Sequence, residues 1–304
     1  MYEKLSTGSL SNNITLASIL FPCSEEQGLD QARLCRQKFV SERKGLPKIA
    51  SAERLEGKGI KSAVSLLFAP GERPRAKQIH ALAANSTHFS ISLDTAANGG
   101  QEEGWLELLA NGMTFDLTGL EPLSGSEVPP SVHTFGTGEG FDPARYEAIL
   151  IQPGPHLAAG GGMFPVVRTL AMVAASVAQL DNVKAVAWHA ARAVSNADYF
   201  RRSVTGWIEG GAFPGLGLAA LFPTENGGLQ SEGLALFTGQ ELHMTPEVVT
   251  DRAEASKIAL RLLNWLVENG RVTQSFLFTT PSGETLRLEP IDSSGIVEVW
   301  RGAH

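Results

Sequence analysis

Cysteine is scarce in this sequence, which holds only Cys23 and Cys35 among its 304 residues. Two thiols cannot build a zinc site of four thiolates, and so low a cysteine content is typical of proteins from a reducing compartment. We therefore predict a cytoplasmic protein without a metal site. No feature of the sequence calls for a cofactor.

Clusters of basic residues are also lacking. The formal net charge is −7, and the densest basic run, Arg36 to Lys48, is interrupted by Glu42. A nucleic-acid interface needs clustered Lys and Arg to neutralise phosphates. The composition therefore predicts no nucleic-acid partner.

No apolar run has the character of a membrane span. Ile14 to Phe21 is only long enough for a β-strand and follows no basic patch, so we expect no signal peptide. Ala148 to Val167 is free of formal charge, but it contains prolines and three consecutive glycines. Such residues break a spanning helix, and we expect no membrane association.

Catalytic signatures are missing as well. The sequence has no Gly-x-Ser-x-Gly elbow, no His-Glu-x-x-His helix and no acidic calcium loop. Neither Ser126 nor Cys23 has an evident activating neighbour. Whether the chain is an enzyme stays open on these grounds, with the balance against catalysis.

The clearest positive feature is the stretch from Ala148 to His189. Its pattern predicts a buried strand, an elbow rich in Pro and Gly from Pro153 to Gly162, a helix and a second buried strand that ends at Trp188. Apolar residues recur in the helix at steps of three and four, from Val166 to Leu180. A strand, a helix and a strand in this order predict a parallel unit.

The rest of the chain mixes helices with hairpins. We therefore predict an α+β fold with mixed sheets, helices packed on one face, one parallel strand–helix–strand unit in the second half and antiparallel hairpins. The other predicted strands are Ile14–Phe21, Ala63–Phe68, His88–Leu93, Trp105–Leu109, Met113–Leu117, Leu216–Phe222, Gly233–Phe237, Ser275–Phe278, Thr285–Leu288 and Ile296–Trp300, and the other predicted helices are Leu29–Val40, residues 76–84, a helix capped by Ser195 and one capped by Asp251.

Residues 121–143 are rich in Gly, Ser and Pro and form either a linker or a long functional loop. We place a boundary there, between an α+β half at 1–145 and a second at 146–304. One continuous fold is the alternative.

The second half resembles an uncharacterised bacterial family, the domain of unknown function numbered four-two-six-one. The resemblance covers roughly residues 148–270 and rests on Ala187-Trp188-His189, on Tyr199-Phe200 in a capped helix, and on Gly233-Leu234 followed by Phe237-Thr-Gly-Gln-Glu-Leu242. The resemblance carries over no catalytic residues. It implies at most a distant kinship with bacterial toxin-immunity and binding folds.

The glycine elbow is the leading ligand candidate. Gly160, Gly161 and Gly162 precede a helix, so free N–H groups there can face an anion, with Arg168 one turn further on. The pattern matches neither the P-loop nor the dinucleotide fingerprint. The glycines are equally explained by a tight turn and close packing. His156 in the same loop is either an acid, base or anion contact or a structural hydrogen-bonding group.

Three further positions have weaker signals. His189 and Arg192 follow the second buried strand, at the end where open sheets bind ligands, although both also suit structural roles. Glu241 and His243 are two residues apart and share a strand face, which makes an incomplete metal site.

These observations leave two hypotheses. The first is a non-catalytic cytoplasmic protein that binds a protein partner, using the loop at 121–143 and the aromatic residues Trp105 and Trp207 as exposed anchors. The second is a small-molecule or anion-binding protein or hydrolase centred on the glycine elbow, with His156, His189 and Arg192 converging on one pocket. The sequence does not predict the oligomeric state.

Overall fold

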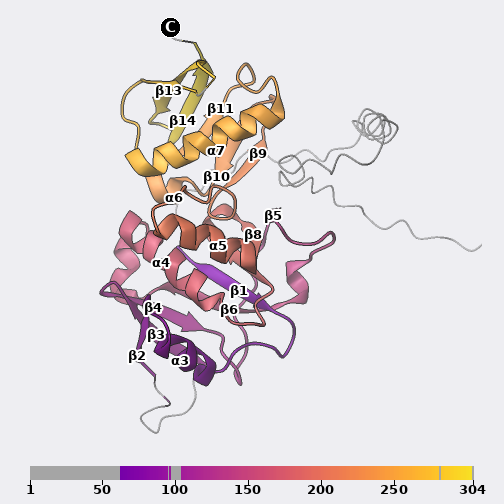
Figure 1. The fold of residues 1–304 in the computed structure, drawn as a ribbon, viewed down its shortest axis with the longest axis vertical. Helices are drawn as coiled ribbons and strands as arrows, with labels where there is room; N and C mark the ends of the chain where they lie inside the picture. Colours follow the sequence, from indigo (N-terminus) through magenta and orange to yellow (C-terminus); the bar gives the residue numbers. More distant parts are fainter. Residues whose placement is uncertain (1–61, 95, 97–103, 281, 303–304) are drawn as a thin grey trace, which may run out of the picture.

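The structure is a computed structural model that describes residues 62–94, 96, 104–280 and 282–302 (Figure 1). The strand predicted at Ile14–Phe21, the helix predicted at Leu29–Val40 and both cysteines lie outside these residues.

Eight strands form the first sheet, in the order β2-β3-β4-β6-β1-β7-β8-β5. Most neighbours are antiparallel, but β5 pairs with β8 in parallel. The strands are β1 (Val64–Phe68), β2 (Ser90–Leu93), β3 (Trp105–Ala110), β4 (Met113–Thr118), β5 (His133–Phe135), β6 (Glu147–Pro153), β7 (Ala185–Trp188) and β8 (Ala193–Asn196).

The predicted strand–helix–strand unit is β6, α4 (Phe164–Val177) and β7. The two strands run parallel but are not neighbours, because β1 lies between them and pairs with each in antiparallel fashion. All five residues of β1 are buried, as expected for a central strand covered on both faces. The α+β class with mixed sheets is confirmed.

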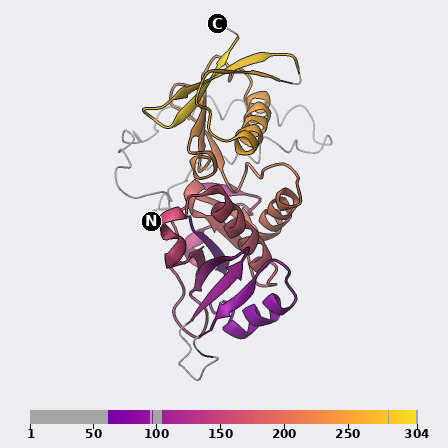
Figure 2. The same ribbon diagram turned by 90° about the vertical axis from the view of Figure 1, so that its left-hand side faces the viewer.

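Helices cover one face of this sheet. They are α3 (Ala76–Ala84), α4 and α5 (Ala197–Ile208), with α4 packed along α5 (Figures 1 and 2). On the opposite face, the small side chains of β6, β7 and β8 pack under Val128 and Phe141. The segment at 121–143 is thus packed over the sheet and adds β5 to its edge.

The second sheet has six strands in the order β12-β13-β14-β11-β10-β9, and α7 (Arg252–Asn269) covers one of its faces. Parallel pairing joins β11 to β14. The elements are β9 (Ala220–Pro223), β10 (Leu229–Glu232), α6 (Ala235–Thr238), β11 (Glu241–Met244), β12 (Phe276–Thr279), β13 (Thr285–Ile291) and β14 (Ile296–Arg301).

Two local predictions are confirmed by backbone geometry. Asn111 and Gly112 have φ values of 50° and 74°, as a two-residue turn joining β3 to β4 requires. Asp251 caps α7 by accepting hydrogen bonds from the N–H groups of Ala253 and Glu254.

Three predictions for the second half are wrong in detail. The N-cap of α5 is Asn196 and not Ser195, because the Asn196 side chain accepts from Tyr199 N while Ser195 lies in β8. Gly233–Phe237 is a turn followed by α6 and not a strand. The strand predicted from Leu216 begins only at Ala220, in β9.

One hydrophobic core connects the two sheets. It runs without a break from Leu106 and Phe115 in the first sheet to Leu288 and Val299 in the second. The first sheet also crosses the predicted boundary after residue 145, since β6 lies between β4 and β1. Among the described helices, none combines the length and apolarity needed to cross a bilayer.

Candidate functional site

The glycine elbow lies at the edge of the first sheet where β6 ends. His156 and Gly160 belong to a 3-10 turn (Pro155–Gly160), and Met163 is the N-cap of α4. The glycines therefore precede the first turn of the helix. Ser62 Oγ donates to the carbonyl of Gly161 at 2.5 Å, which ties the elbow to the start of β1, and His156 is exposed.

His189 lies near the elbow, because the parallel strands β6 and β7 end at the same edge. Its N–H donates to Ala63 O, and its Nε2 lies 2.9 Å from Ser65 Oγ. A serine beside a histidine is the first requirement of a nucleophilic site. Ser65 is fully buried between β6 and β7, however, so its hydroxyl is closed to solvent.

Arg168 and Arg192 turn away from the elbow. The Arg168 guanidinium donates to Ile208 O at 3.0 Å and lies over the Trp207 ring, 5.5 Å from its centroid. It therefore holds α4 against the end of α5. The structure thus brings Gly161 and His189 to one edge and places both arginines elsewhere. The ligand hypothesis at the elbow stays a prediction.

Arg192 belongs to a charged cluster between the two sheets. Its guanidinium binds both oxygens of Glu232 in β10, and His133 Nε2 in β5 lies 2.9 Å from Glu232 Oε2. The His133 ring stacks on Phe222 at 5.8 Å. Burial works against ionisation of Glu232, but hydrogen bonds from His133 and Arg192 outweigh it and lower the pKa of the carboxyl.

The residues behind the family resemblance meet at this junction. Trp188 stacks on Phe237 at 6.1 Å, which joins β7 to α6. Gly233 has a φ of 90°, and a Cβ there would lie 2.7 Å from Ala191 Cβ. Glycine is required at that position by both backbone conformation and space. These residues build the contact between the sheets.

Glu241 in β11 connects the second sheet to the start of α6. Its carboxylate accepts hydrogen bonds from three backbone N–H groups at the start of α6, at 2.8 to 3.2 Å, and from a serine hydroxyl. The donors are Gly233, Leu234, Ala235 and Ser231. Burial raises the pKa of the carboxyl in spite of these bonds. The sequence pattern indicated for Glu241 only an incomplete metal site with His243, and not this set of hydrogen bonds.

Glu241 and His243 do not form a metal site. His243 Nδ1 lies 3.1 Å from Glu298 Oε1, whereas Glu241 faces the start of α6. Within the described ranges, no group of three His, Cys, Asp or Glu side chains is placed to hold a metal ion.

Trp207 is buried, contrary to the prediction of an exposed anchor. Only 8% of it is accessible, and its ring meets Phe213 at 5.4 Å and Phe237 at 6.0 Å in edge-on contacts. The period of α5 placed Trp207 on the face that packs against α4 and α6. Trp105 in β3 is half-buried.

Asp116 in β4 was missed by the sequence reasoning. Its Oδ1 is buried without a hydrogen-bond partner in the described part of the chain, and Glu107 lies opposite on β3. Burial first and the Glu107 charge second raise the pKa of Asp116, while a hydrogen bond from Trp105 opposes them.

We expect Asp116→Asn to stabilise the protein at neutral pH. A raised carboxyl pKa means that the folded state binds the proton more tightly, so stability falls as pH rises from the unfolded value through the folded one. Thermal unfolding at pH 7 and pH 3 checks this. The variant should have the higher melting temperature at pH 7, and the difference should shrink at pH 3, where Asp116 is protonated in both states. A lower melting temperature at pH 7 would contradict the prediction.

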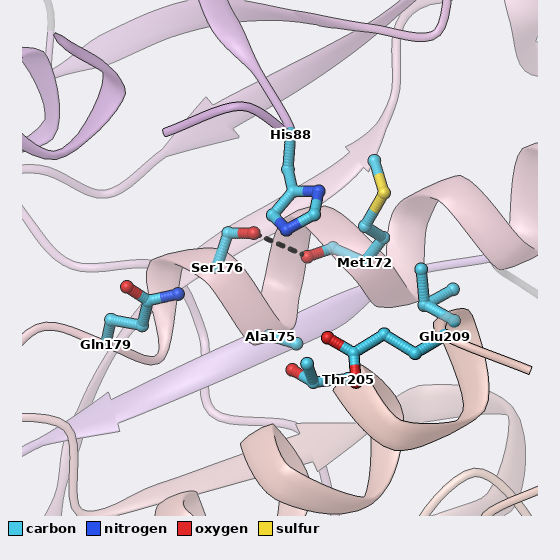
Figure 3. Close-up of a pocket in the computed structure, with 8 residues that line it drawn as sticks. His88, Met172, Ala175, Ser176, Gln179, Thr205 and Glu209 are labelled. Carbon is cyan, nitrogen blue, oxygen red and sulfur yellow. Dashed lines mark hydrogen bonds between the residues drawn. The ribbon is translucent and has the colours of Figure 1, made fainter. Parts of the chain in front are cut away.

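A cavity of about 60 Å³ lies between α4 and α5 (Figure 3). Helix α4 contributes Met172, Ala175 and Ser176, and Gln179 follows from the turn after α4. The end of α5 and His88 form the other sides. Ser176 Oγ donates to Met172 O at 3.0 Å. The side chains that line the cavity are those of His88, Met172, Ala175, Ser176, Gln179, Thr205, Ile208 and Glu209.

The edge strand β12 presents an exposed apolar surface. Phe276 is 42% and Leu277 52% accessible. Trp265 of α7 stacks on Phe276 at 4.7 Å and meets Phe278 at 6.1 Å, so these rings form one face of the strand. Leu277 points to the other face.

Comparison with known proteins gives no match: no family model, no curated protein and no solved structure is similar to this chain. The resemblance to the uncharacterised bacterial family therefore stays a prediction.

Proposed function

We propose that this chain acts by binding a protein partner, and that the partner adds an extended segment to the free side of β12. The observation that carries the proposal is the exposure of Phe276 and Leu277 on a strand that, among the described residues, pairs only with β13. A free strand edge offers unpaired N–H and C=O groups, and apolar side chains beside them favour pairing with another chain.

The other three sheet edges carry features that discourage such pairing. β5 is only three residues long, β9 ends at Pro223, and β2 has an irregular register between Ile91 and Leu93. Short strands, prolines and bulges are the usual protections of an edge. β12 is also short, at four residues, but it contains no proline, no register shift and no charged side chain. The contrast supports β12 as the docking edge.

Both faces of β12 are suited to an incoming strand. Trp265 backs Phe276 and Phe278 from α7, so the rings are held in place before a partner arrives. Aromatic groups fixed in this way lose little entropy on binding and often dominate interface energetics. Leu277 offers a second apolar contact on the opposite face.

We expect Leu277→Lys to abolish capture of the partner. A lysine replaces the exposed apolar contact by a charge that is costly to desolvate, which should weaken binding about 100-fold, or about 2.7 kcal/mol. Quantitative pull-down with the full chain measures the effect. Leu109→Lys is the matched control, because Leu109 is 38% exposed but lies on β3, away from the edge. Equal capture by wild type and Leu277→Lys would rule out β12 as the docking site.

Sedimentation of the purified chain identifies the source of the added strand. A wild-type dimer that becomes monomeric in Leu277→Lys would show that a second copy of the chain fills the edge. A wild-type monomer leaves the edge free for a different protein. In that complex, hydrogen exchange should slow at the backbone amides of β12.

A further inference from the structure

The cavity between α4 and α5 combines an apolar floor with a polar rim. Met172, Ala175 and Ile208 supply aliphatic surface, while Glu209 and His88 bring polar groups from two sides (Figure 3). Glu209 is exposed, and no other described residue forms a hydrogen bond or ion pair with its carboxylate. Among the described residues, the Glu209 carboxylate at the rim thus has no ion-pair partner, and it lies next to an apolar surface.

Helix electrostatics reinforce this negative charge. The cavity is lined by the C-terminal turn of α4, through Ser176, by Gln179 just after that helix, and by the last turn of α5. The C-terminal end of a helix carries a partial negative charge. Arg168 is the cation that approaches α5 here, and it is already held by Ile208 O and the Trp207 ring.

The net charge of the chain also favours a cationic ligand. From residue 62 onward the sequence has 15 Lys and Arg against 25 Asp and Glu. An excess of negative charge raises the local concentration of cations. A cation that also carries an aliphatic chain fits both the rim and the floor.

We propose that this cavity binds a primary alkylammonium group, the chemistry shared by a lysine side chain and a free alkylamine. The ammonium group pairs with the Glu209 carboxylate, and the aliphatic chain lies on Met172, Ala175 and Ile208. His88 bounds the other side, where a neutral imidazole nitrogen accepts a hydrogen bond.

The size of the cavity limits the ligand to such a group. A volume of about 60 Å³ corresponds to about four to six water positions, at roughly 10–15 Å³ each. Pockets for cofactors and nucleotides are several times larger, at about 300–1,000 Å³. The end of a four-carbon chain with its ammonium group is of the appropriate scale.

Methionine-methyl NMR of the full chain tests the proposal, with n-butylammonium chloride as the probe. Met172 lines the cavity, and Met163, exposed just before α4, serves as an internal reference. Met172→Leu assigns the signal. We expect a saturable shift of the Met172 methyl, and for n-butanol, which has the same chain without the charge, a midpoint at least tenfold higher. No saturable shift, or equal midpoints for the two probes, would overturn the proposal.

Two variants test the role of the carboxylate. Glu209→Gln should raise the butylammonium midpoint about tenfold, because it removes a charge-assisted hydrogen bond. Glu225→Gln, at an exposed position between β9 and β10, should leave the midpoint unchanged. An unchanged midpoint in Glu209→Gln, or an equal rise in Glu225→Gln, would show that the cavity does not recognise the ammonium group.

A third comparison identifies the source of the ammonium group. A lower midpoint for Nα-acetyl-lysine amide than for butylammonium supports a protein side chain as the natural ligand, and the reverse order supports a free alkylamine. The site is independent of β12. Leu277→Lys should therefore leave the Met172 response intact, whatever its effect on partner capture.

Discussion

Replacing Glu241 with alanine should destabilise the protein by about 4 kcal/mol, because it removes the acceptor of several buried donors at once. The carboxylate accepts from the N–H groups of Gly233, Leu234 and Ala235 at the start of α6. Those groups have no partner within the short helix itself. At the usual scaling for a chain of this size, the loss corresponds to a fall in melting temperature of about 10 °C.

Glu241→Gln should lie between wild type and Glu241→Ala. Glutamine keeps one carbonyl oxygen, which can serve Gly233 and Ala235, and its NH₂ can donate to the Ser231 hydroxyl. Leu234 N–H then loses its acceptor, at a cost of about 1–2 kcal/mol.

Glu247→Ala provides the control for the loss of a carboxylate. Glu247 also accepts a backbone hydrogen bond, from Arg301 N at 3.1 Å, but it is exposed to water. Its loss should cost less than about 1 kcal/mol, because water replaces the carboxylate. Chemical unfolding of the three variants and wild type measures the series. If Glu241→Ala lowers the free energy of unfolding no more than Glu247→Ala does, water reaches the N–H groups at the start of α6.

Local sequence signals predicted the elements of this fold well. The Asn111-Gly112 turn, the Asp251 cap and the fully buried β1 each depend on interactions between residues close in sequence, or on the burial of a single segment. Such preferences can be recognised from a short stretch of sequence. Ser195 and Asn196 show the limit, because both are good N-caps and only the end of β8 decides between them.

Contacts between residues that are distant in sequence could not be predicted in this way. Position 241 alternates normally within β11, and nothing in its neighbourhood indicates that its carboxylate binds the start of α6. Insertion of β1 between β6 and β7 depends on a strand that is remote in sequence from both. The cavity at Glu209 and the exposed edge at β12 likewise exist only once helices and strands are assembled.

Replacing Phe237 with alanine should cost about 4 kcal/mol and lower the melting temperature by about 10 °C. Phe237 is 7% accessible and meets three rings, those of Trp188 at 6.1 Å, Trp207 at 6.0 Å and Phe213 at 4.9 Å. Its removal loses the transfer energy of a buried ring and leaves a cavity among rigid aromatic groups, which cannot collapse into it.

The same variant tests whether the aromatic cluster joins the two sheets into one cooperative unit. Phe222→Ala is the control, since Phe222 is half-buried and, among the described rings, stacks on His133 alone, and it should cost about 1–2 kcal/mol. All five tryptophans contribute to near-ultraviolet circular dichroism, so the junction signal is the part of it that Trp188→Phe and Trp207→Phe remove. Far-ultraviolet dichroism follows the whole fold. Because one core connects the sheets, both signals should change in a single transition in wild type and in Phe237→Ala. A wild-type junction signal lost well before the secondary structure would show instead that the sheets unfold separately and that Phe237 stabilises only their contact.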